Sequence, residues 1–205
     1  MTVHLIAVSC FLSLTLASSE QSLRALAEKH QTKVIENLRI EHFDPRTPEE
    51  LVTIADTVLS GRILEATPHF TPDEREIVTD YRILVARVIK RDPNLDSAAQ
   101  PGTTRALVIR RKGGTVVEAD IRYSTLTMAF PNHADLVPRE EVVLFLSFDE
   151  RDKAYYFSGG PFGVHRVRGG EVIPMAPETE GGPVRSLGLL EPFLARLQSA
   201  VKKTP

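Results

Sequence analysis

The chain has 205 residues, of which 42% are hydrophobic and 25% are charged, with a formal net charge of −2 at pH 7. This is the composition of an ordinary globular protein, and the length allows a hydrophobic core without disulfides or a structural metal. The nearly balanced charge argues against a large phosphate-binding surface, so nucleic acid is not expected among the partners.

The first 19 residues have the pattern of an export signal that is removed from the mature protein. Leu5–Ala17 is apolar but too short to cross a bilayer, and small residues suited to cleavage follow at Ala17-Ser18-Ser19. No Lys or Arg precedes this run, which leaves a buried N-terminal helix of the fold as the alternative. We therefore expect an exported protein, periplasmic or secreted, with no stable membrane span in its mature form.

The single cysteine, Cys10, lies within the apolar run. We interpret it as an apolar residue of the signal, with lipid attachment as the alternative. The mature chain then contains no thiol. An exported domain without disulfides is more typical of the bacterial envelope or exterior than of eukaryotic secretion.

Residues 20–54 are expected to form an N-terminal helical segment. Ser22–Leu38 has apolar residues at helical spacing, and Phe43-Asp44-Pro45 cannot continue a helix. We favour packing of this helix on its own domain over binding to a partner. Thr47-Pro48-Glu49-Glu50 predicts a second, short helix, because the threonine caps it, the proline fits its first position and the second glutamate reaches back to the cap.

The clearest strand is Ile77–Lys90. Apolar, aromatic or β-branched residues occupy every second position and point to one face: Thr79, Tyr81, Ile83 and Val85. The alternation breaks at Ala86–Arg87 and resumes out of phase, which predicts a bulge that bends the strand. A long bent strand of this kind can serve both sides of a small barrel.

Further strands are predicted on both sides of this one. In the first strand of the chain, Asp56–Leu64, Gly61 indicates a bend or a close approach of two backbones. A polar loop, Glu65–Glu76, is expected before Ile77, and Val142–Leu146 is apolar on both faces, as in an enclosed strand. The predicted ranges are Asp56–Leu64, Arg105–Arg111, Thr115–Ile121, Glu141–Phe148, Ala154–Ser158, Phe162–Val167 and Glu171–Pro174.

These elements predict a mainly β fold. Residues 55–174 are expected to form a small antiparallel OB-like barrel, with the N-terminal helix and a C-terminal helix packed outside. Residues 175–205 comprise a linker and that last helix, whose apolar stripe contains Phe193, Leu194 and Leu197.

Four segments also carry a resemblance to a known family. They are Ala55-Asp56-Thr57-Val58-Leu59-Ser60-Gly61-Arg62-Ile63, Val85-Ala86-Arg87-Val88-Ile89-Lys90, Glu141-Val142-Val143-Leu144-Phe145-Leu146 and Ser158-Gly159-Gly160-Pro161-Phe162-Gly163-Val164. Their order resembles a class of uncharacterised exported bacterial domains, similar in architecture to tissue inhibitors of metalloproteinases (TIMP) and netrin-like modules, which are OB-type β-barrels. The resemblance covers Ala55–Gly170 and implies a fold without implying an activity.

The chain departs from the family pattern at two places. Arg91 and Arg139-Glu140 stand where the pattern has glycines. The metalloproteinase inhibitors bind the zinc of their protease through an N-terminal cysteine, and a mature chain without cysteine does not carry this mechanism.

Candidate metal ligands occur in two short motifs, His42-Phe43-Asp44 and His133-Ala134-Asp135, with His69 and His165 isolated. His42, Asp44, His133 and Asp135 are residue types that bind zinc. Neither motif has the helical i, i+4 spacing of a zinc-binding pair, so we favour surface histidines in loops. A metal-dependent hydrolase using these four residues is the alternative.

Catalytic motifs for nucleophilic chemistry are not found in the sequence, and Ser60 and Ser158 are interpreted as structural residues near strand ends. Glu118 and Asp120 alternate on one face of a predicted strand, and a carboxylate pair for glycoside hydrolysis is one interpretation of them. We favour the solvated face of an exposed strand. The protein is therefore expected not to be an enzyme, and no catalytic residue, metal or cofactor is assigned.

Basic residues occur on two neighbouring predicted strands: Arg87, Lys90, Arg91, Arg110, Arg111 and Lys112. OB barrels bind oligonucleotides on such faces, but no stacking aromatic residues are interleaved here, so solvated charge is favoured. Lys112-Gly113-Gly114-Thr115 lacks the spacing of a phosphate-binding loop and predicts a hairpin turn.

The sequence thus favours a non-catalytic binding or scaffolding module of the bacterial envelope or exterior, with an unknown protein or small ligand as its partner. The ligand surface is expected at the barrel mouth, formed by the Glu65–Glu76 loop and the Lys112–Thr115 turn. Besides the hydrolase, an inhibitor of a secreted protease is an alternative.

Overall fold

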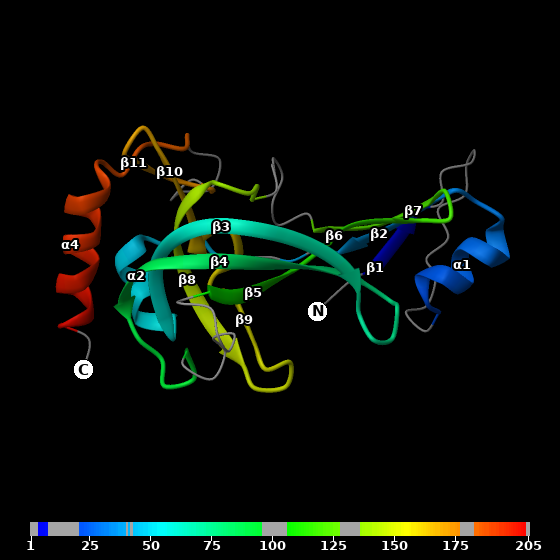
Figure 1. The fold of residues 1–205 in the computed structure, drawn as a ribbon, viewed down its shortest axis with the longest axis horizontal. Helices are drawn as coiled ribbons and strands as arrows, with labels where there is room; N and C mark the ends of the chain where they lie inside the picture. The colour runs from blue at the N-terminus through cyan, green and yellow to red at the C-terminus, as the bar shows by residue number, and fades with distance from the viewer. Residues whose placement is uncertain are drawn as a thin grey trace. The chain divides into compact units, whose positions relative to one another are not determined.

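The computed structural model describes residues 4–7, 21–39, 41, 43–95, 106–127, 136–176 and 183–203 (Figure 1). Its helices are α1 (Leu23–His30), α2 (Pro48–Ile54), the 3-10 helix η1 (Gly160–Gly163) and α4 (Leu190–Val201). Its strands are β1 (His4–Ala7), β2 (Val34–Arg39), β3 (Thr57–Phe70), β4 (Ile77–Lys90), β5 (Ala106–Lys112), β6 (Gly114–Glu118), β7 (Ile121–Thr127), β8 (Glu141–Asp149), β9 (Ala154–Phe157), β10 (Val164–Arg168) and β11 (Glu171–Pro174). None of the helices in these ranges combines the length and the apolar character needed to cross a membrane.

The chain forms two compact units that interleave along the sequence. Unit 1 takes residues 1–42, 67–80 and 111–132, and unit 2 takes residues 43–66, 81–110 and 133–205. β3, β4 and β5 each contribute residues to both units. A single barrel was expected over residues 55–174, but two segments of that range, 67–80 and 111–132, belong to unit 1.

Five strands close into a ring in the order β8-β3-β4-β5-β9, because β9 pairs with both β5 and β8. The expected mainly β fold, with a short N-terminal helix and a C-terminal helix, is confirmed. One pairing departs from the antiparallel expectation, since β5 and β9 run parallel where the ring closes. β10 and β11 continue the sheet from β8.

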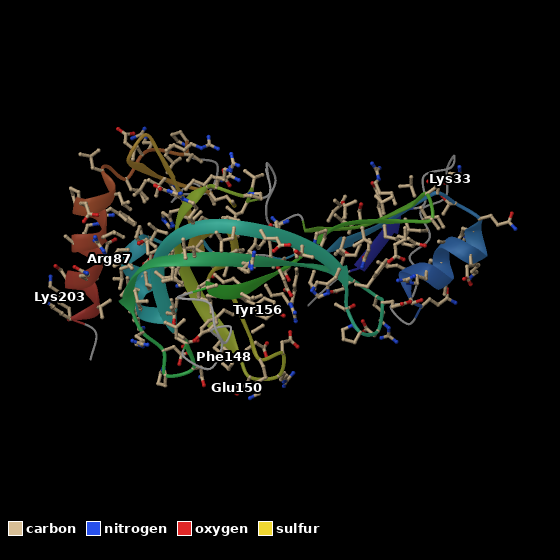
Figure 2. All side chains as sticks on the ribbon, viewed as in Figure 1. Lys33, Arg87, Phe148, Glu150, Tyr156 and Lys203 are labelled. Carbon is tan, nitrogen blue, oxygen red and sulfur yellow. The ribbon has the colours of Figure 1, made fainter. Side chains whose placement is uncertain are left out.

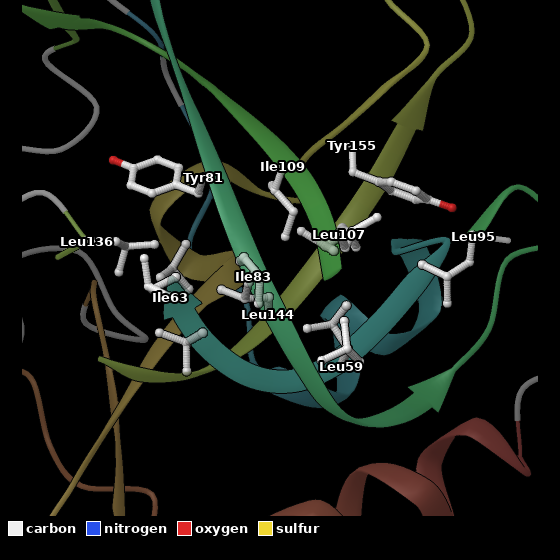
Figure 3. Close-up of a cluster of buried hydrophobic side chains, with 14 residues drawn as sticks. Leu59, Ile63, Tyr81, Ile83, Leu95, Leu107, Ile109, Leu136, Leu144 and Tyr155 are labelled. Atoms are coloured by element: carbon white, nitrogen blue, oxygen red, sulfur yellow. The ribbon is translucent and has the colours of Figure 1, made fainter. Parts of the chain in front are cut away.

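The core of the ring contains the side chains that the β4 pattern placed inward (Figure 3). Tyr81, Ile83 and Val85 are buried on β4, and beyond the break in the pattern Val88 packs against the same cluster. The inward side thus changes from odd to even residue numbers, as one extra residue in the strand requires. The predicted change of phase is confirmed.

Gly61 on β3 lies where two backbones approach closely. A Cβ atom at this position would be 2.5 Å from the carbonyl oxygen of Leu84 on β4, so only glycine fits. The expectation for Gly61 is confirmed.

β8 is buried on both faces, as its apolar run predicted. Val142, Leu144 and Leu146 belong to the core of the ring, whereas Val143 and Phe145 belong to a second core. This second core is formed with α2, α4 and β11, and α4 contributes Phe193, Leu194 and Leu197, the residues of its predicted stripe.

α2 begins as its sequence predicted. The Thr47 side chain accepts the Glu50 backbone N–H at 3.3 Å, and the Thr47 backbone N–H donates to a Glu50 carboxylate oxygen at 2.8 Å. At the other end, Lys90 Nζ donates to the carbonyl oxygens of Val52 and Ala55 at 2.9 and 2.6 Å. Both ends of this short helix therefore have partners for their backbone groups.

The helix predicted over Ser22–Leu38 is wrong beyond His30. α1 ends at Gln31, which adopts a left-handed conformation with φ 47°, and the chain continues as β2. Ile35 and Asn37 are buried in β2, which pairs in parallel with β7. Val34, Ile35 and Leu38 have helical spacing, and one of the two residues that β2 buries is the polar Asn37, so no apolar alternation marked this strand. Its pairing with a distant strand decides the structure.

Unit 1 is built on a four-stranded sheet with the order β1-β2-β7-β6. β1, which lies within the expected export signal, pairs antiparallel with β2. The core of unit 1 combines residues of α1, the sheet and the beginning of β4: Leu23, Leu26, Ala27, Ile35, Ile77 and Tyr123.

Candidate functional site

The two segments expected to form a ligand surface come together in unit 1. The Gly113 backbone N–H donates to the carbonyl oxygen of Ile77 at 2.8 Å, and the Thr79 hydroxyl donates to the carbonyl oxygen of Gly113 at 2.7 Å. A Cβ atom on Gly114 would lie 2.5 Å from Thr79 Oγ1, so this junction requires glycine. Ile77 and Thr79 directly follow the Glu65–Glu76 segment, and Pro68 of that segment also lies next to Gly114. Apart from residues 65 and 66, both segments belong to unit 1, and the ligand surface expected from them stays a prediction.

The expected form of both segments needs correction. Residues 65–70 belong to β3, so the connection to β4 is only the turn 71–76. Polar residues on the outward side of a strand made this part resemble a loop. Lys112–Thr115 is not a hairpin turn, because β5 and β6 belong to different sheets.

Arg24 of α1 is the centre of the polar surface in this unit. Its Nε is 2.9 Å from Glu74 Oε1 in the β3–β4 turn, and its Nη1 is 2.7 Å from Glu118 Oε2 at the end of β6. The guanidinium carbon also lies 4.6 Å from the centre of the Phe70 ring. Arg24 thus connects α1, the turn and the β6–β7 hairpin through groups that are each about two-fifths exposed, where ion pairs contribute about 0–1 kcal/mol each.

Aromatic residues lie beneath this surface. The rings of Phe70 and Tyr123 pack edge to face with centroids 5.2 Å apart. Burial raises the pKa of Tyr123, and the carboxylates of Glu118, Glu28 and Glu74 act in the same direction. Tyr123 is therefore neutral at pH 7 and serves as a packed support for the charged groups.

His69 and Asp80 connect β3 to β4 within the same unit. His69 Nε2 lies 3.0 Å from Asp80 Oδ2, and Nδ1 lies 3.0 Å from the carbonyl oxygen of Phe70. His69, isolated in the sequence, is thus a bonded residue of the hairpin.

The carboxylate pair considered for glycoside hydrolysis is wrong. Ala119 and Asp120 form the turn between β6 and β7, with φ values of 47° and 63°, so Asp120 does not share a strand face with Glu118. Glu118 is paired with Arg24. Two-residue hairpin turns usually contain glycine or asparagine, and Ala-Asp gave little sequence signal for one.

His165 is a core residue and not the surface loop residue that the sequence suggested. It lies on β10 between two aromatic rings, with centroid distances of 5.3 Å to Phe145 and 5.7 Å to Phe193. Burial, together with the positive charge of Arg196, lowers the pKa of His165 to about 3. The imidazole is neutral at pH 7 and belongs to the packing of α4.

Of the four residues of the alternative metal site, the structure describes only Asp44. Asp44 is exposed, and His42, His133 and Asp135 lie outside the described residues. Within the part of the chain that the structure describes, no three His, Cys, Asp or Glu residues are grouped so that they could hold a metal ion.

Two of the basic residues considered for a surface patch bind neighbouring helices. Arg87, which Figure 2 labels, donates two hydrogen bonds to the Glu191 carboxylate of α4, at 2.9 and 3.2 Å. Lys90 donates to the end of α2, as described above. Arg87 and Glu191 are both exposed, so the expected solvated charge holds for Arg87. Lys90 is half-buried, and its charge is bound by two carbonyl oxygens.

A buried polar cluster in unit 2 gave no sequence signal. The Tyr155 hydroxyl donates to Asp92 Oδ2 at 3.0 Å, and Thr57 Oγ1 accepts the Asp92 backbone N–H at 3.2 Å. Burial raises the pKa of Tyr155 above its usual range. These contacts join residues that are far apart in sequence, and they hold the end of β4 on the ring.

The two candidate serines have the structural role expected of them. Ser60 and Ser158 are both buried, and the hydroxyl oxygen of Ser158 lies 2.6 Å from that of Ser147 on β8.

Comparison with known proteins gives no match, either to a family model or to a curated protein.

Proposed function

We propose that the chain is a non-catalytic binding or scaffolding module of the bacterial envelope or exterior, related in architecture to the TIMP and netrin-like modules. The observation that carries this proposal is the role of the residues in its signature segments. These residues hold the backbone of the scaffold in place, and the binding surface that we propose lies in unit 1.

Asp56 gives the first example, since its Oδ2 accepts the backbone N–H of Phe148 at 2.9 Å. Gly61 allows the approach of β3 to β4, and Lys90 binds the end of α2. Gly160 makes room for the Phe43 ring, which would lie 2.6 Å from a Cβ atom at that position. A signature made of such residues supports a scaffold more readily than a reaction.

The binding surface that we propose is the polar face of unit 1 around Arg24. α1, the β3–β4 turn and the β6–β7 hairpin each supply one member of its ion pairs. Exposed turns and hairpin ends held on a packed support are the usual position of binding residues. The face carries glutamates around one arginine, so a partner with basic groups fits it best.

The experiment is capture of partners from an envelope extract of the source organism by the immobilised protein. Glu118→Gln and Glu74→Gln remove negative charge from the proposed face, whereas Glu141→Gln removes a similarly exposed carboxylate, paired with Arg62, from unit 2. We expect a specific partner to be lost with the first two variants and retained with the third. Equal capture by all three variants would move the binding surface elsewhere, and conversion of a substrate by the purified protein would contradict a non-catalytic module.

A further inference from the structure

β6 is the last strand of the four-stranded sheet in unit 1, and among the described strands it pairs only with β7. Its sequence is Gly-Thr-Val-Val-Glu. Proteins usually protect such an edge with lysine, proline, a bulge or a covering element. β6 contains no lysine or proline, its register with β7 is uninterrupted, and Val117 is 66% exposed.

The hairpin geometry shows which backbone groups face outward. The turn residues Ala119 and Asp120 both have positive φ, as in a type I′ turn, and Glu118 pairs with Ile121 next to it. In such a hairpin the pair next to the turn is hydrogen-bonded, and bonded pairs alternate with non-bonded ones. The N–H and C=O groups of Thr115 and Val117 therefore point away from β7.

The side chains agree with this alternation. Thr115 lies opposite Ser124, and their hydroxyl oxygens are 3.0 Å apart. Side chains approach each other most closely in non-hydrogen-bonded pairs. Thr115 and Val117 thus offer two donors and two acceptors at an exposed edge.

This pattern is complementary to a second copy of itself. If two β6 strands run antiparallel with Val116 opposite Val116 of the second copy, Thr115 faces Val117 of the second copy. Each of these pairs has the outward groups needed to exchange two hydrogen bonds. Glu118 faces Gly114 of the second copy, so no like charges are opposed.

We propose that β6 pairs antiparallel with β6 of a second copy of the chain, about a two-fold axis at Val116, and joins the two four-stranded sheets into one. The interface is isologous, as in most homodimers. A strand of five residues provides less contact area than a standard interface, so the dimer is weak and forms as concentration rises. This edge adjoins the proposed partner-binding face, because Glu118 belongs to both.

The first test is the molecular mass of the full chain, measured by sedimentation between about 10 µM and about 1 mM, a range typical of weak interfaces. Native protein is expected to change from monomer to dimer. Val117→Pro removes a donor that points to the free edge and leaves the bonds to β7, so it is expected to stay monomeric. Val117→Thr keeps both the β-branched shape and the donor, and it is expected to dimerise like the native protein.

The second test fixes the register with cysteines in a Cys10→Ser background. Val116→Cys is expected to form a disulfide between copies, because Cα atoms in a non-bonded pair are about 4.5 Å apart. Val117→Cys is expected not to crosslink, because the two Cα atoms are then about 8 Å apart, beyond the reach of a disulfide. Circular dichroism and thermal unfolding verify that each variant is folded.

Three results would overturn the proposal. They are a native chain that stays monomeric at the highest concentration, a folded Val117→Pro variant that dimerises as strongly as the native protein, and a dimer in which Val116→Cys does not crosslink.

Discussion

His165 makes a prediction about how stability depends on pH. The residue is fully buried beside Phe145 and Phe193, and its pKa is lowered to about 3. In the unfolded chain a histidine has a pKa of about 6.5. Between these two values the unfolded state binds a proton that the folded state does not.

The sign follows from this difference. His165 makes its full contribution to the free energy of unfolding above about pH 6.5, where the imidazole is neutral in both states. This contribution is lost as the pH falls toward 3. The loss has a limiting slope of about 1.4 kcal/mol per pH unit, so between pH 6.5 and 4.5 it amounts to about 2 kcal/mol. Carboxylates with lowered pKa values, such as Asp73, also lose stabilisation in acid, so the native protein alone does not isolate the histidine.

The comparison with His165→Leu isolates it, because leucine has a similar volume and does not titrate. Urea unfolding of both proteins at pH 7.5, 6.5, 5.5 and 4.5 gives the free energies of unfolding. We expect the native protein to lose about 2 kcal/mol more than the variant between pH 6.5 and 4.5. Two curves that stay parallel over this range would refute the burial of a neutral imidazole.

Three further predictions concern the scaffold and the alternative function. Gly61→Ala is expected to cost about 2 kcal/mol or more, because its Cβ would overlap the carbonyl oxygen of Leu84, and an unchanged urea midpoint would contradict this. Thr47→Ala is expected to lower the free energy of unfolding by about 1 kcal/mol through loss of the α2 cap, whereas Thr47→Ser should preserve it. Purified protein is expected to hold no stoichiometric zinc and to melt at the same temperature after chelation. Zinc that is lost in His133→Ala would instead favour the metal-dependent hydrolase.

The parts of the fold that the sequence predicted correctly are those with a strong local signal. The alternation in β4 placed Tyr81 and Ile83 in the core, and the capping residues of α2 gave its start. β2 was missed because its apolar residues have helical spacing and it buries the polar Asn37, and only its pairing with β7, more than 80 residues away, selects the strand. Local patterns do not contain that information.

The candidate surface could be predicted only in part. The segments Glu65–Glu76 and Lys112–Thr115 were expected at one surface, and Gly114 does lie beside Pro68, although residues 65–70 form a strand and Lys112–Thr115 connects two sheets. The role of Arg24 was not predictable, because its partner Glu118 is 94 residues away and nothing in either local sequence selects the other. Asp120 was placed on a strand face for the opposite reason, since an Ala-Asp turn has weak local preferences.

The sharing of β3, β4 and β5 between the units has a practical consequence for anyone who dissects the protein. Unit 1 is assembled from three separated stretches of chain, and the excision of any contiguous fragment leaves it without one of them or takes part of unit 2 with it. Truncation at a single point is therefore a poor way to obtain either half. Many of the contacts in the chain also join residues that are distant in sequence, a topology associated with slow folding.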